Sequence, residues 1–334
     1  MPMDLLAVGD ITIDNFIRLK DASVHCDIDK ESCEICMRWG DKIPYDFTEE
    51  VLAVGNSANA AVAAARLGLK SSLRTYVGAD THGEQCVASL KKDGVDISLT
   101  EKVAGKRTNY HFVLWYESER TILIKHETFD YALPLGLSVA EGPKWFYLSS
   151  LGDGSLSYHH TWIELLEKWP ETKLAFQPGT FQMNFGREAL AAVYRRADIF
   201  FCNKEEAERI LAVPKTDDVK NLLKQMRALG PKKVVITDDR KGAYAMNESD
   251  KAWLVPLYPD PRPPYERTGA GDAFASSVTS ALALEKTFEE ALLWGPVNAM
   301  SVVQAVGAQK GLLTRAELEE YLKSAPADYA LKEL

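Results

Sequence analysis

Four residues late in the chain, Gly269-Ala270-Gly271-Asp272, place two glycines and one carboxylate directly before a run of small and apolar residues. The run predicts a helix, and the first turn of a helix carries backbone N–H groups without partners inside the helix. These groups attract anions, and glycines let an anion approach the backbone closely. A carboxylate at such a place repels phosphate, so Asp272 needs a chemical reason: it can take the proton of a hydroxyl that attacks a phosphoryl group.

The same four residues also fit an ordinary helix start, because Asp is common in the first turn of a helix and short motifs recur by chance. The elements that surround the motif must therefore decide between the two interpretations.

Those elements alternate between short apolar runs and helical patterns along most of the chain. Strands are predicted at 5–14, 71–78, 144–152, 172–179, 198–203, 232–238, 242–247 and 251–258. Helices are predicted at 56–68, 81–95, 157–169, 187–197, 204–212, 219–230, 272–284, 287–306 and 314–325. This alternation predicts a mostly parallel sheet with helices on both faces, which binds ligands beyond the carboxyl ends of its strands. An aromatic and β-branched hairpin at 108–126 interrupts the pattern and predicts a small β-sheet appendage.

The bulk composition fits one large α/β unit. The chain has 334 residues, of which 46% are hydrophobic and 26% charged, and its formal net charge is −9. An acidic chain is a poor partner for nucleic acid, whose binding depends on basic surface. No stretch approaches the roughly 20 apolar residues of a membrane helix, and the first residues lack the basic region of a signal peptide. These features predict a cytoplasmic protein without nucleic-acid or membrane partners.

Five cysteines are present, and three of them form a cluster with one histidine: His25, Cys26, Cys33 and Cys36. Thiolate and imidazole groups suit zinc, which usually takes four such ligands. Only one Cys-x-x-Cys pair occurs, and an odd cysteine count without a secretion signal argues against disulfides. We expect a loop of reduced thiols, with zinc as the alternative.

The segment Glu266–Ser277, "ERTGAGDAFASS", resembles the second signature of the ribokinase-like (PfkB) carbohydrate and nucleoside kinases. The resemblance extends in order over essentially the whole chain. It implies a three-layer α/β/α fold in a single domain, residues 1–334, with a β-sheet lid formed by approximately 13–50 and 104–126. It also implies that Asp272 is the catalytic base and that the amides of Gly269, Ala270 and Gly271 form an anion hole.

The segment 54–68, "VGNSANAAVAAARLG", resembles the first signature of the same family, which holds substrate hydroxyls. Gly55 and Asn59 match that signature, Val54 departs from it, and Asn56 is a further polar candidate. Asp14, at the end of "VGDITID", is similar to the family's sugar-binding acid, and Asp10 is a weaker candidate.

Further matches concern the nucleotide. Asn203 and Glu206 resemble an element that organises Mg²⁺ and phosphate, with Glu206 as the metal-associated acid. The other nucleotide-binding candidates that the resemblance implies are Thr237, Gly242, Asn298, Gly307 and Ala308. Two residues depart from the family pattern: Asp239 replaces a glycine, and Arg267 replaces the threonine of an acid-threonine pair that helps to bind a monovalent cation. Glu266 keeps the acid of that pair, so dependence on potassium stays open.

The resemblance implies ATP-dependent phosphorylation of a primary hydroxyl of a sugar such as ribose or another pentose or hexose. A nucleoside kinase is the alternative within the family, since aromatic residues in the lid could stack on a base. A non-catalytic sugar- or nucleotide-binding protein and a dinucleotide-dependent dehydrogenase are alternatives of other classes. The expected ligands are ATP and Mg²⁺, and the aromatic lid hairpin is compatible with a homodimer contact.

Overall fold

The chain folds around a nine-stranded sheet in this computed structural model, which describes residues 3–27, 33–117, 119–135, 137 and 141–334. The strand order is β17 (Lys332–Glu333), β16 (Ala252–Val255), β15 (Ala243–Met246), β14 (Lys233–Thr237), β13 (Ile199–Asn203), β12 (Lys173–Phe176), β11 (Trp145–Leu148), β1 (Leu5–Val8) and β6 (Ser71–Arg74). Neighbours from β6 to β14 are parallel, and β14 to β17 are antiparallel. The predicted mostly parallel sheet is therefore confirmed.

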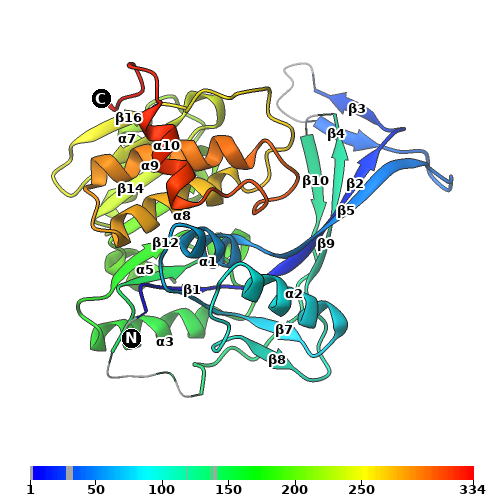
Figure 1. The fold of residues 1–334 in the computed structure, drawn as a ribbon, viewed down its shortest axis with the longest axis horizontal. Helices are drawn as coiled ribbons and strands as arrows, with labels where there is room; N and C mark the ends of the chain where they lie inside the picture. The colour runs from blue at the N-terminus through cyan, green and yellow to red at the C-terminus, as the bar shows by residue number, and fades with distance from the viewer. Residues whose placement is uncertain (1–2, 28–32, 118, 136, 138–140) are drawn as a thin grey trace.

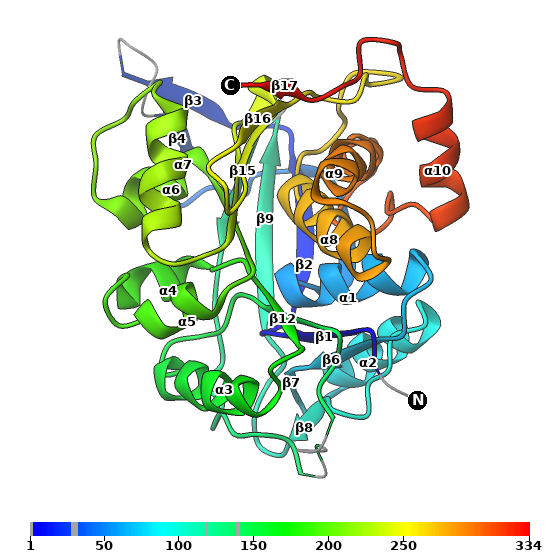
Figure 2. The ribbon, with the colours of Figure 1, turned by 90° about the vertical axis from the view of Figure 1, so that its left-hand side faces the viewer.

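Helices cover both faces of this sheet (Figure 2). One face carries α1 (Asn56–Arg66), α2 (Thr81–Lys92), α8 (Ala270–Ala283), α9 (Phe288–Val302) and α10 (Arg315–Lys323). The other carries α3 (Leu156–Lys168), α4 (Thr180–Phe185), α5 (Ala191–Arg196), α6 (Lys204–Leu211) and α7 (Val219–Ala228).

Strand β1 shows how the sequence builds the two hydrophobic cores between these layers. Side chains alternate between the faces of a strand. Leu5 and Ala7 accordingly belong to the core beneath α1 and α8, whereas Leu6 and Val8 belong to the core beneath α3 and α7. All four residues are fully buried. The continuous apolar run that predicts this strand is thus explained by burial on both sides.

A separate four-stranded sheet projects from one end of the large sheet (Figure 1). Its order is β10 (Glu119–Leu123), β9 (Tyr110–Tyr116), β2 (Thr12–Leu19) and β5 (Tyr45–Val54). These strands come from the two chain segments that the sequence assigns to a lid. Phe16, Val113 and Trp115 form a small buried cluster with Val306 on one side of this sheet. The small sheet is therefore packed against the loop that follows α9.

The shorter elements complete the fold. A parallel pair is formed by β7 (Tyr76–Gly78) and β8 (Glu101–Val103), and η1 (Asp239–Lys241) is a single 3₁₀ turn after β14. Strands β8 and β17 and the short helix α4 have no counterpart in the sequence prediction. Among the helices of the described residues, none combines the length and the apolar character needed to cross a lipid bilayer.

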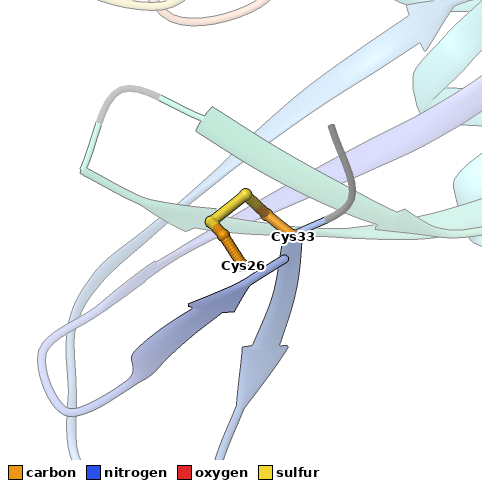
Figure 3. The surroundings of a disulfide bond; sticks show 2 residues. All are labelled: Cys26 and Cys33. Atoms are coloured by element: carbon orange, nitrogen blue, oxygen red, sulfur yellow. A yellow bond between two sulfur atoms is a disulfide. The ribbon is translucent and has the colours of Figure 1, made fainter. Parts of the chain in front are cut away.

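The cysteine cluster lies on a hairpin at the outer end of the small sheet, formed by β3 (Ser23–Cys26) and β4 (Cys33–Cys36). Cys26 and Cys33 face each other across the two strands and form a disulfide (Figure 3). The expectation of reduced thiols is therefore wrong for this pair, because strand pairing brings the two residues together, and Cys36 stays free. In the described part of the chain, no three His, Cys, Asp or Glu side chains are grouped so as to hold a metal, so the zinc alternative gains no support.

Candidate functional site

The start of α8 has the geometry of an anion site. Gly269 is the residue before the helix and has a φ of 82°. A side chain there would be strained by that φ and would collide with Ala308, so only glycine fits. No side chain caps this helix end. Ala270 N–H makes only a long hydrogen bond, 3.5 Å, to the Arg267 carbonyl, so the first turn can still offer N–H groups to a ligand. Gly271 faces open space, so a bound group can come close to the backbone.

Asp272, in the first turn of α8, does not cap its own helix. Its Oδ2 accepts a hydrogen bond from Asn59 Nδ2 at 2.7 Å, and its Oδ1 accepts one from Gln177 Nε2 at 2.9 Å. Asn59 comes from α1 and Gln177 from the end of β12. Each carboxylate oxygen therefore has one amide donor and keeps a further lone pair for a hydroxyl group.

Two further side chains orient these amides. Gln309 donates to Asn59 Oδ1 at 3.0 Å, and the Tyr147 hydroxyl donates to Gln177 Oε1. Because the oxygen end of each amide is occupied in this way, its N–H end faces Asp272. The carboxylate is thus fixed by a network that joins α1, β11, β12, α8 and the loop after α9.

Burial raises the pKa of Asp272, and the two amide hydrogen bonds oppose this effect. The charge of Asp14 adds to the increase. A carboxylate with a raised pKa is a stronger base, which suits proton removal from an alcohol.

Two neighbouring cavities meet at this helix end. The smaller, of about 190 Å³, is lined by Asp272, Glu206 and Asn56 among others. The larger, of about 570 Å³, extends over β14, η1 and one side of α9. Both are bordered by Asn203, Thr237, Ala270 and Gly271. The larger cavity has the volume of a typical small-molecule site, which spans roughly 300–1,000 Å³.

The predicted phosphate and metal residues border these cavities. Asn203 and Glu206 form a reciprocal cap at the start of α6: Glu206 N–H donates to Asn203 Oδ1 and Asn203 N–H to Glu206 Oε2, each at 2.8 Å. Both side chains therefore cap α6, and the carboxylate of Glu206 keeps further lone pairs free. Burial raises the pKa of Glu206. Thr237 borders both cavities, and Gly242, with a φ of 92°, borders the larger.

Asp239 and Arg267, which depart from the family pattern on the nucleotide side, contact each other. Arg267 Nη1 lies 2.7 Å from Asp239 Oδ1, and Arg267 borders both cavities. Asp239 has a φ of 41°, in the region that glycine favours. The replacement of a glycine by Asp239 therefore supplies the partner of an arginine beside the anion site.

A second arginine reaches the same place from the small sheet. Arg120 on β10 borders both cavities, and its Nε lies 3.6 Å from Oε1 of the buried Glu266. Glu266 also accepts hydrogen bonds from the N–H and hydroxyl of Thr268. Arg120 therefore connects the small sheet to the loop that precedes α8.

The predicted acceptor-binding residues lie on the other side of Asp272. Asp14, on β2, is 8% exposed, and its Oδ1 lies 3.3 Å from His111 Nδ1. Gly55 precedes α1 with a φ of 117°, and a side chain there would lie 2.9 Å from the carbonyl oxygen of Asp10. Asn56 borders the smaller cavity, whereas Asn59 is buried and bound to Asp272.

Three predicted nucleotide residues are placed elsewhere. Asn298 is fully buried, donates to Ser277 Oγ at 2.8 Å and accepts from Leu313 N–H at 2.9 Å, so its side chain fastens α9 to α8 and is not open to a ligand. Gly307 and Ala308 line neither cavity and lie behind the start of α8, where Ala308 packs on Gly269. The physical reason is that the loop after α9 packs against the residue that precedes α8 and so lies outside both cavities.

The sequence prediction lacks Arg120 and the pairing of His111 with Asp14, and it places Gln177 at a strand end facing the cleft without giving it a partner. Gln177 carries one signal, its place at the carboxyl end of a parallel strand. The positions of Arg120 and His111 depend on how the small sheet folds over the large one, which local sequence does not report.

The comparisons with known proteins agree with this geometry. The pfkB family carbohydrate kinase profile matches residues 28–315. A ribokinase from Haemophilus influenzae is 27% identical over 282 residues, covering 81% of this chain and 87% of that protein. A nucleoside kinase from Methanothermobacter thermautotrophicus is 26% identical over 231 residues, covering 68% and 70%. The structure of Arabidopsis thaliana ribokinase complexed with ribose and ATP has a TM-score of 0.80 at 20% identity, covering 97% and 99%, and shows the same fold. The chain therefore belongs to the pfkB family of carbohydrate kinases.

Proposed function

We propose that the protein transfers the γ-phosphoryl group of ATP to a primary hydroxyl of a sugar, with Asp272 as the general base. One observation carries this proposal: a carboxylate with a raised pKa stands between an uncapped helix start and a group of buried acids and amides. The helix start can hold phosphoryl oxygens, and the group of acids and amides can hold an alcohol.

Different residues of this chain have different roles in such a transfer. Asp14 and Asn56 hold hydroxyls of the acceptor, and Asp272 removes the proton from the attacking one. The N–H groups at the start of α8 bind the phosphoryl oxygens, and Arg267 and Arg120 add positive charge beside both cavities. Phosphoryl transfer depends mainly on positioning and electrostatic stabilisation, and these residues supply both.

The larger cavity suits the nucleotide. Its walls include apolar side chains that can contact a base, among them Phe274, Ala299, Met300 and Val303. Thr237 and Gly242 border its polar part, towards the smaller cavity. We place the base against α8 and α9 and the phosphates towards Gly271.

Glu206 fits an association with Mg²⁺, because its carboxylate borders the smaller cavity and hard oxygen ligands suit this ion. When bound, the ion neutralises charge on the phosphates of the nucleotide. No group of three acids or histidines suited to a metal occurs in the residues that the structure covers, so the nucleotide and water would supply the other ligands.

The small sheet, strands β2, β5, β9 and β10, acts in this proposal as a lid over the acceptor, since it supplies Asp14 and Arg120. Its exposed apolar side chains Tyr45, Phe112 and Leu123 support a homodimer contact through the lid. Light scattering of the wild type and of Phe112→Asp tests this part: a dimer that the substitution dissociates agrees with it, and a monomeric wild type contradicts it.

A nucleoside kinase is the second candidate, because a nucleoside kinase is among the similar proteins. The discriminating experiment measures ADP release with Mg²⁺ and ATP over ribose, fructose and adenosine, with and without potassium. We expect a free sugar to have the highest kcat/KM. Higher kcat/KM for adenosine would favour the nucleoside kinase, and ligand binding without ADP release would favour a non-catalytic protein.

A further inference from the structure

Four side chains on the acceptor side of Asp272 leave polar atoms without hydrogen-bond partners. These atoms are Asp10 Oδ1, Asp14 Oδ1, His111 Nε2 and His126 Nδ1. Asp10 is 4% exposed, and Asp14 and His111 are each 8% exposed, so water has little access to their side chains. A buried polar atom without a hydrogen-bond partner is energetically unfavourable. Such atoms on neighbouring side chains, as on Asp14, His111 and His126, indicate a binding site for a polar ligand.

Contacts link three of these side chains, Asp14, His111 and His126, to one another. His111 on β9 stands beside Asp14 on the neighbouring strand β2, with 3.3 Å between Nδ1 and Oδ1. The rings of His111 and His126 have centroids 5.1 Å apart, and the His126 ring meets Phe181 at 5.2 Å. The two histidines therefore extend from Asp14 towards α4.

The same contacts lead back to the catalytic carboxylate. Phe181 lies on α4, four residues after Gln177, which donates to Asp272. At the other end, Asp14 is close enough to Asp272 for its charge to act on that carboxyl group. The unpartnered atoms of Asp14, His111 and His126 thus belong to the surroundings of Asp272.

The chemistry of these groups favours hydroxyl donors. Asp10 and Asp14 carry carboxylate oxygens, which accept hydrogen bonds. His111 Nε2 and His126 Nδ1 can each accept a hydrogen bond from a hydroxyl group or donate one to it, according to the tautomer of the ring.

The charges of the same groups disfavour an anionic acceptor. Burial lowers the pKa of His126 to about 4, so this ring is neutral at pH 7. A phosphate or carboxylate on the acceptor would meet the carboxylates of Asp10, Asp14 and Asp272 with no positive charge from His126 to balance them.

We propose that His111 and His126, together with Asp10 and Asp14, bind hydroxyl groups of an uncharged polyhydroxylated acceptor, and that His111 is a specificity-determining residue of this site. The proposal rests on the proposed function and narrows it: sugar phosphates and sugar acids are excluded as preferred acceptors.

The first test compares matched acceptors that differ in charge. We would measure ADP release and, without nucleotide, equilibrium binding by calorimetry for fructose against fructose 6-phosphate and for glucose against gluconate, with ribose and adenosine as further uncharged compounds. An uncharged compound should have the highest kcat/KM, at least 100-fold above that of any anionic one. The proposal is overturned if an anionic compound is preferred or if none of the uncharged compounds binds. Binding of an uncharged compound without phosphorylation would keep this inference and remove the proposed function.

The second test separates the two nitrogens of His111. In His111→Asn the amide reaches the position of Nδ1 only, whereas in His111→Gln it reaches towards Nε2. Using the preferred acceptor, we expect the asparagine variant to raise KM and the calorimetric Kd at least tenfold, with kcat within threefold of wild type. The glutamine variant should recover most of that loss.

His82 offers a matched control, because its ring contacts Tyr110, whose side chain points to the opposite face of β9 from His111. His82→Asn should leave KM unchanged. A purely structural role for His111 would lower the melting temperature without changing KM, and that result, or equal effects of the two asparagine variants, would overturn the assignment. If His111→Asn does not fold, His126→Asn provides the same readout from the neighbouring ring.

Discussion

At the scale of single residues, Asp272 depends on two amide groups for its protonation state. Asn59 and Gln177 each donate a hydrogen bond that favours the charged carboxylate, whereas burial favours the neutral form. In the proposed mechanism, the balance between these effects sets the pH below which Asp272 is protonated and cannot act as the base.

Gln177→Met removes one donor and keeps the side-chain length. The pKa of Asp272 should therefore rise further, and the acid limb of the kcat profile should move to higher pH. Gln304→Met is the control, since Gln304 binds Arg262 instead. An acid limb that stays in place in Gln177→Met would show that this hydrogen bond does not tune the base.

Asp10 predicts a dependence of stability on pH. Its Oδ2 accepts hydrogen bonds from the Tyr131 hydroxyl at 2.6 Å and from Gly152 N–H at 2.8 Å, yet burial raises its pKa to about 6. The folded state thus binds this proton more tightly than the unfolded state. The contribution of Asp10 to the free energy of unfolding is therefore greatest below pH 4 and is lost as the pH rises to about 6.

Asp10→Asn keeps an oxygen for both hydrogen bonds and removes the charge. We expect it to raise the free energy of unfolding at pH 7.5 by up to about 3 kcal/mol, and to have little effect below pH 4. Urea titrations at both pH values measure this. Asp4→Asn should act in the opposite direction at pH 7.5, because hydrogen bonds from Lys70 N–H and Lys144 outweigh burial and lower the pKa of Asp4. Equal effects of Asp10→Asn at the two pH values would contradict the account.

At the scale of elements, the two glycines at the start of α8, Gly269 and Gly271, have different roles. Gly269 serves the fold, because its φ of 82° and its contact with Ala308 exclude a side chain. We assign Gly271 to the proposed phosphate site instead, because nothing lies within 4 Å of the place where its side chain would begin.

Gly271→Ala should therefore fold with a free energy of unfolding within about 0.5 kcal/mol of wild type, the usual range for exposed positions. Its added methyl group enters the space shared by both cavities, and we expect kcat/KM for ATP to fall at least tenfold. Gly269→Ala should instead lose stability by about 1–3 kcal/mol through backbone strain. Thermal unfolding and steady-state kinetics on the pair distinguish the two roles, and normal kinetics in Gly271→Ala would contradict the anion site.

At the scale of the whole molecule, the sequence predicts the architecture well because local patterns encode it. The alternation of apolar runs and helical periods follows from burial on both faces of the sheet, as β1 illustrates. Asp272, Gly55 and Asn59 are recognisable because their motifs are contiguous in the chain. The pairing of Cys26 with Cys33 cannot be recognised from the sequence, because it depends on the register of a short exposed hairpin.

The rest of the site could not be predicted, because it is assembled from distant segments. Gln177 lies 95 residues from Asp272 in the chain, and Arg120 reaches Glu266 only because the small sheet folds over the large one. Asn298 illustrates the same limit: its motif indicates the helix, but the packing of α9 on α8 turns its side chain inward. Long-range packing, which no local pattern records, decides these positions.

The most direct test of the central claim is the turnover of Asp272→Asn with saturating ATP, Mg²⁺ and the preferred acceptor. The asparagine can still contact Asn59 and Gln177 but cannot accept the proton of the hydroxyl. The account predicts a folded protein that binds ATP with unchanged affinity and has a kcat lower by about 10²-fold or more, a typical scale for a general base. A kcat near that of the wild type would contradict it.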